Sequence, residues 1–314
     1  MFKIPILFLT YNRPNLTRKS LKEIIKINPY KIYIANDGPK NQADKIKVLE
    51  VRKIFKKIKT KIKIKTKYNN KNLGCKVSNV QAIDWFFKNE ARGIILEDDC
   101  IANKDFFLFC ENLLKKYYNN KNVFCISGSN FQKKKIGKDS YYFSKYNHCW
   151  GWATWRSRWK KNDVNIKFWP KFKKSKLWNN IHYNKIEKKY WTIHFEKAYK
   201  KKIDSWAYPW TLSVWKQNGI TATPNSNLVK NIGHGLDSSH SHFMNRPIKY
   251  FNNKNFNSRI EHPKKIIINK NADEFVFKNH FNGYKLVWPY NLIYLIKLII
   301  SNPLLFLSKL IAYK

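Results

Sequence analysis

Strand-like and helix-like segments alternate through the N-terminal third of the chain, and this alternation constrains the fold more than any other feature. The segments with strand character are residues 4–9, 31–35, 61–65 and 93–96. Three of them are apolar runs typical of buried strands, and the third along the chain alternates strictly, as edge strands do. The segments with helical spacing between them are residues 16–27, 43–58 and 77–87. This order predicts an α/β fold in which a mostly parallel central sheet is flanked by helices.

The elements after residue 100 are less regular. We expect them at residues 106–117, 122–127, 182–200, 220–223 and 228–232. Four tryptophans lie within residues 150–159, and Trp152, Trp155 and Trp159 are predicted to share one face of a core helix. Residues 233–254 are rich in His, Ser and Asn and are expected to form a loop.

The sequence carries a net charge of +42, from 62 Lys and Arg residues against 20 Asp and Glu residues. Such a charge attracts nucleic acid, an anionic membrane surface or phosphate-bearing substrates. The basic residues spread along the whole chain, and no nucleic-acid-binding motif accompanies them. AT-rich codon bias together with attraction to an anionic membrane surface therefore explains this charge better than nucleic acid does.

The cysteines and the chain ends bear on the compartment. Five scattered cysteines without a CxxC pair argue against a disulfide framework and a cysteine zinc site, and for a reducing compartment. The first apolar run ends at Leu9, too early for an export signal or a membrane span. Residues 287–314 are apolar but interrupted by Lys297 and Asn302-Pro303. An amphipathic anchor lying in the membrane plane fits this pattern best, with a packed helix and a true span as alternatives.

Three consecutive carboxylates, Glu97, Asp98 and Asp99, follow the apolar run at 93–96 directly. Gathering three negative charges at the end of a buried strand is costly unless a cation neutralises them. Mn²⁺ and Mg²⁺ prefer oxygen ligands and also bridge phosphates. The triplet therefore predicts a divalent metal site for a phosphate-bearing ligand, and a polar strand cap is the structural alternative.

Other polar clusters also follow predicted strands or precede helices. Ligands of parallel sheets bind beyond the carboxyl ends of the strands, where Thr10–Arg13 and Asn36-Asp37 are expected. Asp37 suits either a nucleoside hydroxyl or a turn. Asn72–Lys76 precedes a helix, and its backbone amides and lysine suit either phosphate binding or a plain helix entry.

Two further candidates lie in the second half of the chain. Asp204 stands among aromatic residues that are expected to desolvate it partly, which suits a general base. It also precedes a helical run, so an N-cap of that helix is the structural alternative. His234, His240 and His242 lie near Asp237, where one histidine of this group suits the completion of a metal shell, and plain surface positions in a loop are the structural alternative.

Several of these motifs together resemble nucleotide-sugar glycosyltransferases of the GT-A fold, most closely the N-acetylglucosaminyltransferase I type and bacterial family 2 enzymes. The matching segments are Thr10–Pro14, Asn36–Gly38, Asn72–Gly74, Leu96–Asp99 with Asp105–Phe107, and Gly151-Trp152. The resemblance covers about residues 3–235, and the Glu-Asp-Asp element is its most specific part. It implies a Rossmann-like GT-A domain.

The resemblance also implies roles for individual residues. Arg13 and Asp37 would contact the nucleotide base, Asp98 the ribose or donor sugar, and Glu97 the donor sugar. Asp99 would bind Mn²⁺ or Mg²⁺ at the diphosphate. Independently of the resemblance, His240 of the histidine-rich segment is expected as the further ligand. The other residues implied on the nucleotide side are Thr10, Tyr11, Asn72, Gly74 and Lys76. Asp204 falls at the position of the catalytic base, although here the segment reads Asp204-Ser-Trp206 where the family has paired aspartates.

The resulting expectation is a GT-A catalytic domain over 1–235, with a nucleotide-binding half of about 1–100 and an acceptor half of about 101–235. A loop-rich extension, 236–286, and membrane-associating helices, 287–314, would follow. The predicted enzyme transfers a sugar with inversion from a nucleotide-diphosphate donor, favoured to be a UDP-sugar, to an oligosaccharide or lipid-linked acceptor in surface polysaccharide synthesis. It would lie on the inner face of the cell membrane. The alternatives are a metal-dependent nucleotidyltransferase and a non-catalytic basic protein that binds membrane or nucleic acid.

Overall fold

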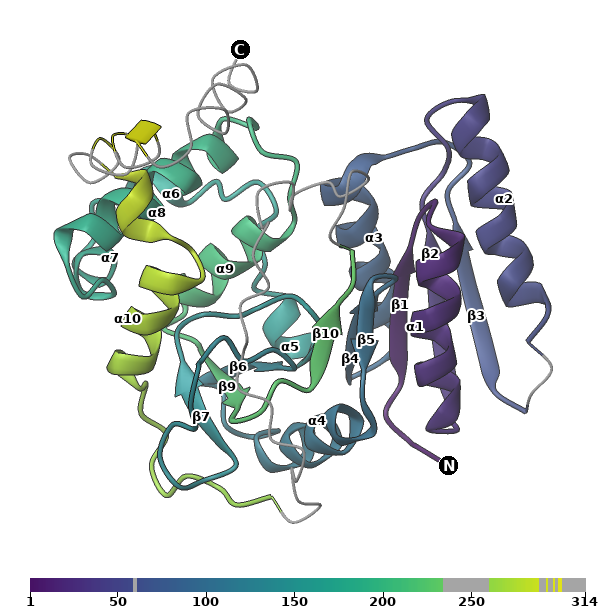
Figure 1. Ribbon diagram of the computed structural model, residues 1–314, viewed down its shortest axis with the longest axis horizontal. Coiled ribbons are helices and arrows are strands. Elements are labelled where there is room, and N and C mark those ends of the chain that lie inside the picture. The colour runs from purple at the N-terminus through teal and green to yellow at the C-terminus, as the bar shows by residue number, and fades with distance from the viewer. Residues whose placement is uncertain (59–60, 234–259, 288–291, 293–295, 297–298, 301–314) are drawn as a thin grey trace.

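The computed structural model describes residues 1–58, 61–233 and 260–287, together with positions 292, 296, 299 and 300 (Figure 1). Its strands are β1 (Ile6–Thr10), β2 (Lys31–Asn36), β3 (Lys63–Tyr68), β4 (Arg92–Glu97), β5 (Cys100–Ala102), β6 (Val123–Ser127), β7 (Tyr141–Ser144), β8 (Trp152–Trp155), β9 (Ile220–Pro224) and β10 (Val229–Asn231). The helices before β8 are α1 (Pro14–Lys26), α2 (Gln42–Lys56), α3 (Gly74–Asn89) and α4 (Lys104–Lys116). The later ones are α5 (Arg156–Trp159), α6 (Trp169–Phe172), α7 (Lys176–Asn180), α8 (Lys185–Tyr199), α9 (Ala207–Lys216), α10 (Lys270–Asn279) and the 3₁₀ turn η1 (Gly283–Leu286).

Eight strands form the central sheet in the order β3-β2-β1-β4-β8-β6-β9-β7. The four strands from β3 to β4 are parallel to one another, and β6 is parallel to β9, whereas β8 and β7 run antiparallel to their neighbours. The predicted mostly parallel sheet with flanking helices is therefore confirmed. The lysine-rich β3 lies at the edge of the sheet, as its alternating pattern predicted.

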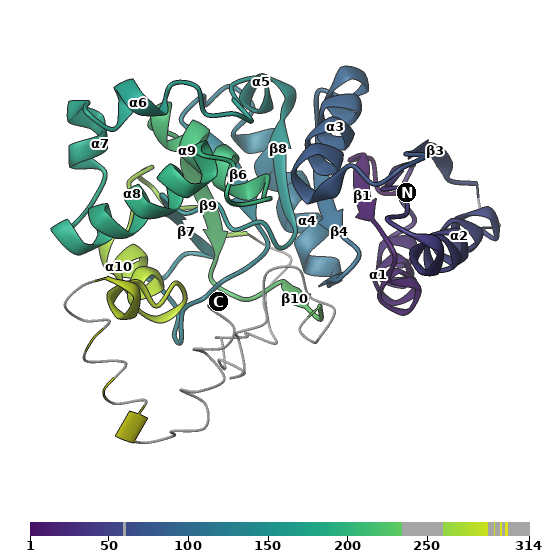
Figure 2. The ribbon, with the colours of Figure 1, turned by 90° about the horizontal axis from the view of Figure 1, so that it is seen from above.

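The helices cover both faces of this sheet, with α1, α2 and α4 on one face and α3 and α5 to α9 on the other (Figure 2). Each face has its own apolar core, because alternate strand residues point to opposite sides. Leu7 and Ile95, for example, pack with α3, whereas Phe8 and Ile94 pack with α1 and α4. Asparagine side chains begin several of the helices by accepting an amide hydrogen bond; these caps are Asn41, Asn103, Asn184 and Asn269.

The tryptophan-rich segment is buried as predicted, but the predicted helix face is wrong. Trp152 and Trp155 belong to strand β8, and helix α5 begins only at Arg156. Two strand positions three residues apart face opposite sides, so Trp152 joins the core under α3 and Trp155 joins the core under α4. Strand pairing with β4 and β6 overrides the helical spacing of these tryptophans.

A two-stranded ribbon adds to the carboxyl edge of the sheet. β5 follows the acidic triplet and pairs antiparallel with β10, so Asn231 lies opposite Cys100. The Ile232 amide then donates to the Asp99 carbonyl at 2.8 Å. This pairing brings residues 231–233 beside the triplet, although the two segments are far apart in the sequence.

The segment expected to be rich in loops contains helix α10, which packs Val276 and Phe277 into the core beside α8. His240, with the other loop histidines, and most of 287–314 lie outside the described residues. Within the described part of the chain, no helix is both long enough and apolar enough to cross a membrane.

Candidate active site

The carboxyl ends of β1, β2 and β4 lie side by side, as the strand pattern predicted. Thr10 at the end of β1 donates from Oγ1 to the Ala35 carbonyl at 3.0 Å. Asn36 at the end of β2 donates in return to Thr10 Oγ1 at 3.1 Å and to the Tyr11 carbonyl at 2.9 Å. These side-chain bonds fix the loops of β1 and β2 next to β4 and its acidic triplet.

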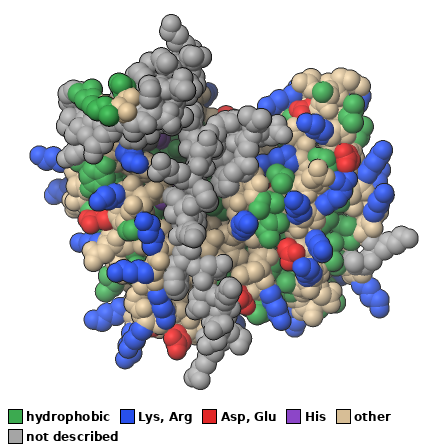
Figure 3. Space-filling model, viewed as in Figure 1, with side chains coloured by type: hydrophobic (Ala, Val, Ile, Leu, Met, Phe, Trp, Pro, Cys, Tyr) green, Lys and Arg blue, Asp and Glu red, His purple; other side chains and the backbone are tan. Residues whose placement is uncertain are grey.

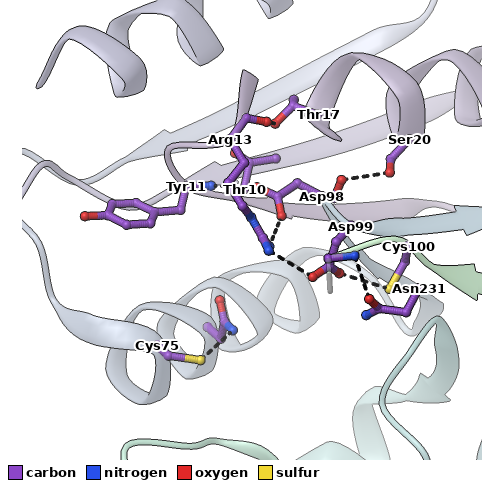
Figure 4. A network of polar contacts seen from close by, with 12 residues as sticks. Thr10, Tyr11, Arg13, Thr17, Ser20, Cys75, Asp98, Asp99, Cys100 and Asn231 are labelled. Atoms are coloured by element: carbon purple, nitrogen blue, oxygen red, sulfur yellow. Dashed lines mark hydrogen bonds and ion pairs between the residues drawn. The ribbon is translucent and has the colours of Figure 1, made fainter. Parts of the chain in front are cut away.

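Arg13 connects the β1 loop to the acidic triplet (Figure 4). Its Nη1 lies 3.1 Å from Asp99 Oδ2, and its Nη2 forms an ion pair with Asp98 Oδ1. Asp98 is held further by the Tyr11 amide, which donates to Oδ2 at 3.3 Å, and by Ser20, whose hydroxyl donates to the Asp98 carbonyl at 2.8 Å. The Asp98 side chain is 2% exposed and that of Asp99 is 11% exposed, so both charges lie in a largely desolvated place.

The crowding of negative charge changes the protonation of the triplet. Burial raises the pKa of Glu97 to about 8, and the charges of Asp99 and Asp98 add to this rise against the effect of Arg13. Burial also raises the pKa of Asp98 to about 6, although Arg13 opposes the change. Added positive charge at this place would stabilise the ionised triplet.

Asp37 anchors the loop that leads into α3. Its Oδ1 accepts hydrogen bonds from the Gly38 amide at 2.8 Å and from Asn69 Nδ2 at 3.0 Å. The Leu73 amide donates to both carboxylate oxygens at 3.1 and 3.2 Å, and Asn72 Nδ2 donates to Oδ2 at 3.0 Å. In this arrangement the Asp37 carboxylate, predicted to contact a base, is already bonded on both oxygens by its own chain.

Asp204 lies at the N-terminus of α3. Its Oδ2 accepts from the Cys75 amide at 3.1 Å and its Oδ1 from the Lys76 amide at 3.0 Å. Gly74 begins α3 with φ +79, and a Cβ there would lie 3.0 Å from Asp204 Oδ2, so glycine permits this contact. The backbone amides of Cys75 and Lys76, which were predicted to face phosphates, therefore donate to the Asp204 carboxylate instead.

Two expectations about Asp204 itself are wrong. The residue is exposed and not desolvated by its aromatic neighbours, and α9 begins with Trp206 as its N-cap. Asp204 caps a helix, but one that lies 129 residues earlier in the chain. Its neighbour in that helix, Cys75, is affected by both halves of the site: burial raises the pKa of the Cys75 thiol to about 12, and the charges of Glu97 and Asp204 contribute.

The sequence reading missed two residues of helix α2 that support the site. Asp44 accepts the Tyr11 hydroxyl, and it accepts Asn12 Nδ2 at 2.5 Å. Arg52 donates from Nε to Asn36 Oδ1 at 2.7 Å. Their spacing in α2 carries no signal for this role, because both contacts depend on how α2 packs beside the β1 and β2 loops.

Asp99, the more exposed of the two aspartates of the triplet, is the candidate ligand for the predicted divalent cation. Its Oδ2 contacts Arg13, its Oδ1 lies 3.5 Å from the Cys100 thiol, and a Cβ at Gly233 would lie only 2.2 Å from Oδ2. Among the residues that the structure describes, no group of three or more His, Cys, Asp or Glu side chains is arranged to hold a metal. Ions such as Mg²⁺ that arrive with a phosphate substrate need only one or two carboxylates, because water and phosphate supply the other oxygens. The few oxygen ligands at Asp99 suit an ion that arrives bound to a diphosphate better than an ion held by protein side chains alone.

Comparison with protein-family models gives no match for this sequence, and comparison with curated proteins gives none either. Several solved structures match parts of this chain at low identity. UDP-glucose pyrophosphorylase complexed with UDP-glucose is 7% identical, with a TM-score of 0.36 over 71% of this chain and 90% of that one. HddC from Yersinia pseudotuberculosis is 12% identical, with a TM-score of 0.33 over 54% of this chain and 86% of that one. An active-site mutant of LgtC is 11% identical, with a TM-score of 0.32 over 55% and 65% of the two chains.

Similarity at these levels carries no conclusion about activity, and the resemblance to the N-acetylglucosaminyltransferase I type stays a prediction.

Proposed function

We propose that this protein is a metal-dependent glycosyltransferase that uses a nucleotide-diphosphate sugar as donor. The observation that carries the proposal is the buried Asp98-Asp99 pair, which meets Arg13 at the carboxyl edge of the parallel strands. Substrates of parallel α/β sheets bind at this edge. Carboxylates with a guanidinium beside them suit a ligand that brings both phosphates and a divalent cation.

The proposed roles follow from the positions of the side chains. Asp99 would hold Mn²⁺ or Mg²⁺ at the donor diphosphate, where the ion would stabilise the charge that develops on the leaving group. Glu97, next to Asp99 and half-buried, would lie near the donor sugar. Asp98 and Arg13 would bind the nucleotide side, together with Thr10, Tyr11 and Lys76, while Asp37, Asn72 and Gly74 would position the loop that leads into α3.

The proposed reaction is a single displacement with inversion. A hydroxyl oxygen of the acceptor forms a bond to the anomeric carbon while the bond from that carbon to the diphosphate oxygen breaks. The hydroxyl proton passes to Asp204, and the nucleoside diphosphate leaves with the bonding electrons. Support for Asp204 comes from its exposed carboxylate, which lies at the N-terminus of α3 beside Cys75 and Lys76.

The proposal includes an oligosaccharide or lipid-linked acceptor of surface polysaccharide synthesis and a place on the inner face of the cell membrane. Support comes from the net charge of +42 and from basic side chains spread over both halves of the face in Figure 3. The described residues near the C-terminus, Leu292, Ile296, Ile299 and Ile300, are helical, apolar and 43%, 47%, 44% and 78% exposed. Binding to phosphatidylglycerol vesicles but not to phosphatidylcholine vesicles would support this place, and binding to neither would contradict it.

The test of the donor site is a thermal-shift screen of nucleoside diphosphates and nucleotide sugars with and without Mn²⁺. A ligand that binds only the folded protein raises the unfolding midpoint, and we expect UDP or a UDP-sugar to do so in the presence of Mn²⁺. Asp99→Asn should remove the Mn²⁺-dependent part of the shift. Glu50→Gln is the matched control, because Glu50 pairs with Arg18 on the surface.

The products separate the proposed enzyme from its alternatives. A glycosyltransferase releases a nucleoside diphosphate from a nucleotide sugar. Pyrophosphate release from a nucleoside triphosphate and a sugar phosphate would instead identify a nucleotidyltransferase. No shift with any nucleotide, together with steep salt dependence of binding to polyanions, would identify a basic binding protein.

A further inference from the structure

We propose that Arg13 is an internal cation that keeps Asp98 and Asp99 from binding a free divalent metal ion, so that the ion binds together with the nucleotide diphosphate. The nucleotide part of this inference rests on the proposed function. The competition between Arg13 and the ion does not depend on it.

The contacts of the guanidinium support this role. Its two Nη atoms bind two different carboxylates, Asp98 through Nη2 and Asp99 through Nη1 at 3.1 Å. A planar guanidinium suits such two-point binding and remains charged at all physiological pH values. It therefore neutralises part of the charge for which the acidic triplet would otherwise need a metal ion.

The same contacts exclude a metal ion from Asp99. Divalent ions lie about 2.0 to 2.6 Å from a carboxylate oxygen. An ion on Asp99 would then stand a few ångströms from the guanidinium that holds Oδ2. Two like charges at that separation repel strongly where side chains are as little exposed as Asp98 and Asp99. Arg13 and the ion therefore compete for one carboxylate.

A diphosphate removes the conflict because it brings negative charge for both cations. The phosphate oxygens can bind the ion on one side and the guanidinium on the other. The backbone of Arg13 stays fixed meanwhile, since its carbonyl accepts from both the amide and the hydroxyl of Thr17 at 2.9 Å. Its side chain is 23% exposed, so it can turn toward the ligand without moving α1. Metal binding and nucleotide binding are coupled through this one side chain.

The experiment measures Mn²⁺ binding directly, by the electron paramagnetic resonance signal of free Mn²⁺, with no sugar transfer involved. Without nucleotide, Arg13→Gln should bind Mn²⁺ about tenfold more tightly than the wild type, a typical size for coupling between two sites. Arg13→Lys keeps the charge but not the two-point contact, so its affinity for Mn²⁺ should lie between those of the wild type and Arg13→Gln. Arg18→Gln is the matched control, because Arg18 lies inside the neighbouring helix α1 and pairs with Glu50 at 48% and 46% exposure.

The wild type supplies a second measurement that does not depend on any variant. With UDP present, the wild type should bind Mn²⁺ about tenfold more tightly than UDP alone binds Mn²⁺ in solution. Arg13→Gln should lose most of this gain. An Arg13→Gln variant that folds normally, judged by its circular dichroism, and binds free Mn²⁺ no better than the wild type would overturn the proposal. If UDP does not bind at all, the donor assignment fails, while the nucleotide-free comparison still tests the competition.

Discussion

Asp204 should have two separable roles, as the cap of α3 and as the acceptor of a proton, and three variants can separate them. Its carboxylate accepts two amide hydrogen bonds at 3.1 and 3.0 Å, both at exposed positions where water can replace it. Asp204→Ala should therefore lower stability by about 1 kcal/mol, in the middle of the range for N-caps. In a chain of this size that is a shift in the unfolding midpoint of about 2 °C. Asp204→Ser keeps an oxygen that can cap, so it should lose less than half of that stability.

Turnover should respond differently from stability. Loss of a general base lowers turnover by about 100- to 10 000-fold, or about 3 to 5 kcal/mol in activation free energy. Asp204→Ser and Asp204→Ala should lose turnover equally, although only the second loses the cap. The assay is release of nucleoside diphosphate under saturating donor and acceptor, alongside a thermal melt. Asn269→Ala, which removes the cap of α10, should reproduce the stability loss with normal turnover. Normal turnover in Asp204→Ser would remove Asp204 from the chemistry, and an unchanged midpoint in Asp204→Ala would remove it from the cap.

Three further predictions concern the charges of the structure. The folded protein holds the pKa of Glu97 at about 8, above its ordinary value of 4.5. Between pH 4.5 and pH 8 the folded protein therefore binds more protons at Glu97 than the unfolded chain does. Stability without added metal should fall as pH rises from about 5 to 8, and Glu97→Gln should flatten this fall in urea unfolding; identical profiles would refute the shift. Gly233→Ala would place a Cβ 2.2 Å from Asp99 Oδ2, and it should weaken Mn²⁺-dependent nucleotide binding about tenfold in a binding titration; unchanged affinity would contradict the predicted contact. Lys145→Ala would leave Glu187 buried without its ion pair at 2.7 Å, costing about 3 to 5 kcal/mol by urea unfolding; adding Glu187→Gln should restore part of this, and no restoration would contradict the pairing.

Part of the candidate site was predictable because it depends on single strands and their ends. The apolar run at 93–96 and the three carboxylates after it are adjacent in the chain, and β4 ends at Glu97. The residues after β1 and β2 were likewise placed at the same edge as the triplet, because parallel strands share one carboxyl edge. The position of the acidic triplet thus follows from local patterns.

The partners of these residues were not predictable. The sequence suggested that Asp204 caps the helix that follows it, but in the structure Asp204 caps α3. It offered Trp152 and Trp155 as one helical face, but pairing with β4 turned the segment into a strand. In each case the local pattern allowed two outcomes, and contacts with distant segments selected one.

The sequence by itself determined the alternation of strands and helices, the parallel sheet and the acidic edge, because apolar periodicity acts over a few neighbouring residues. Only the tertiary structure decided that Arg13 binds Asp98 and Asp99, that Asp37 holds the loop at Asn72, and that Asp204 reaches α3. The physical reason is that strand order and register set which distant side chains meet, and these depend on the packing of the whole core.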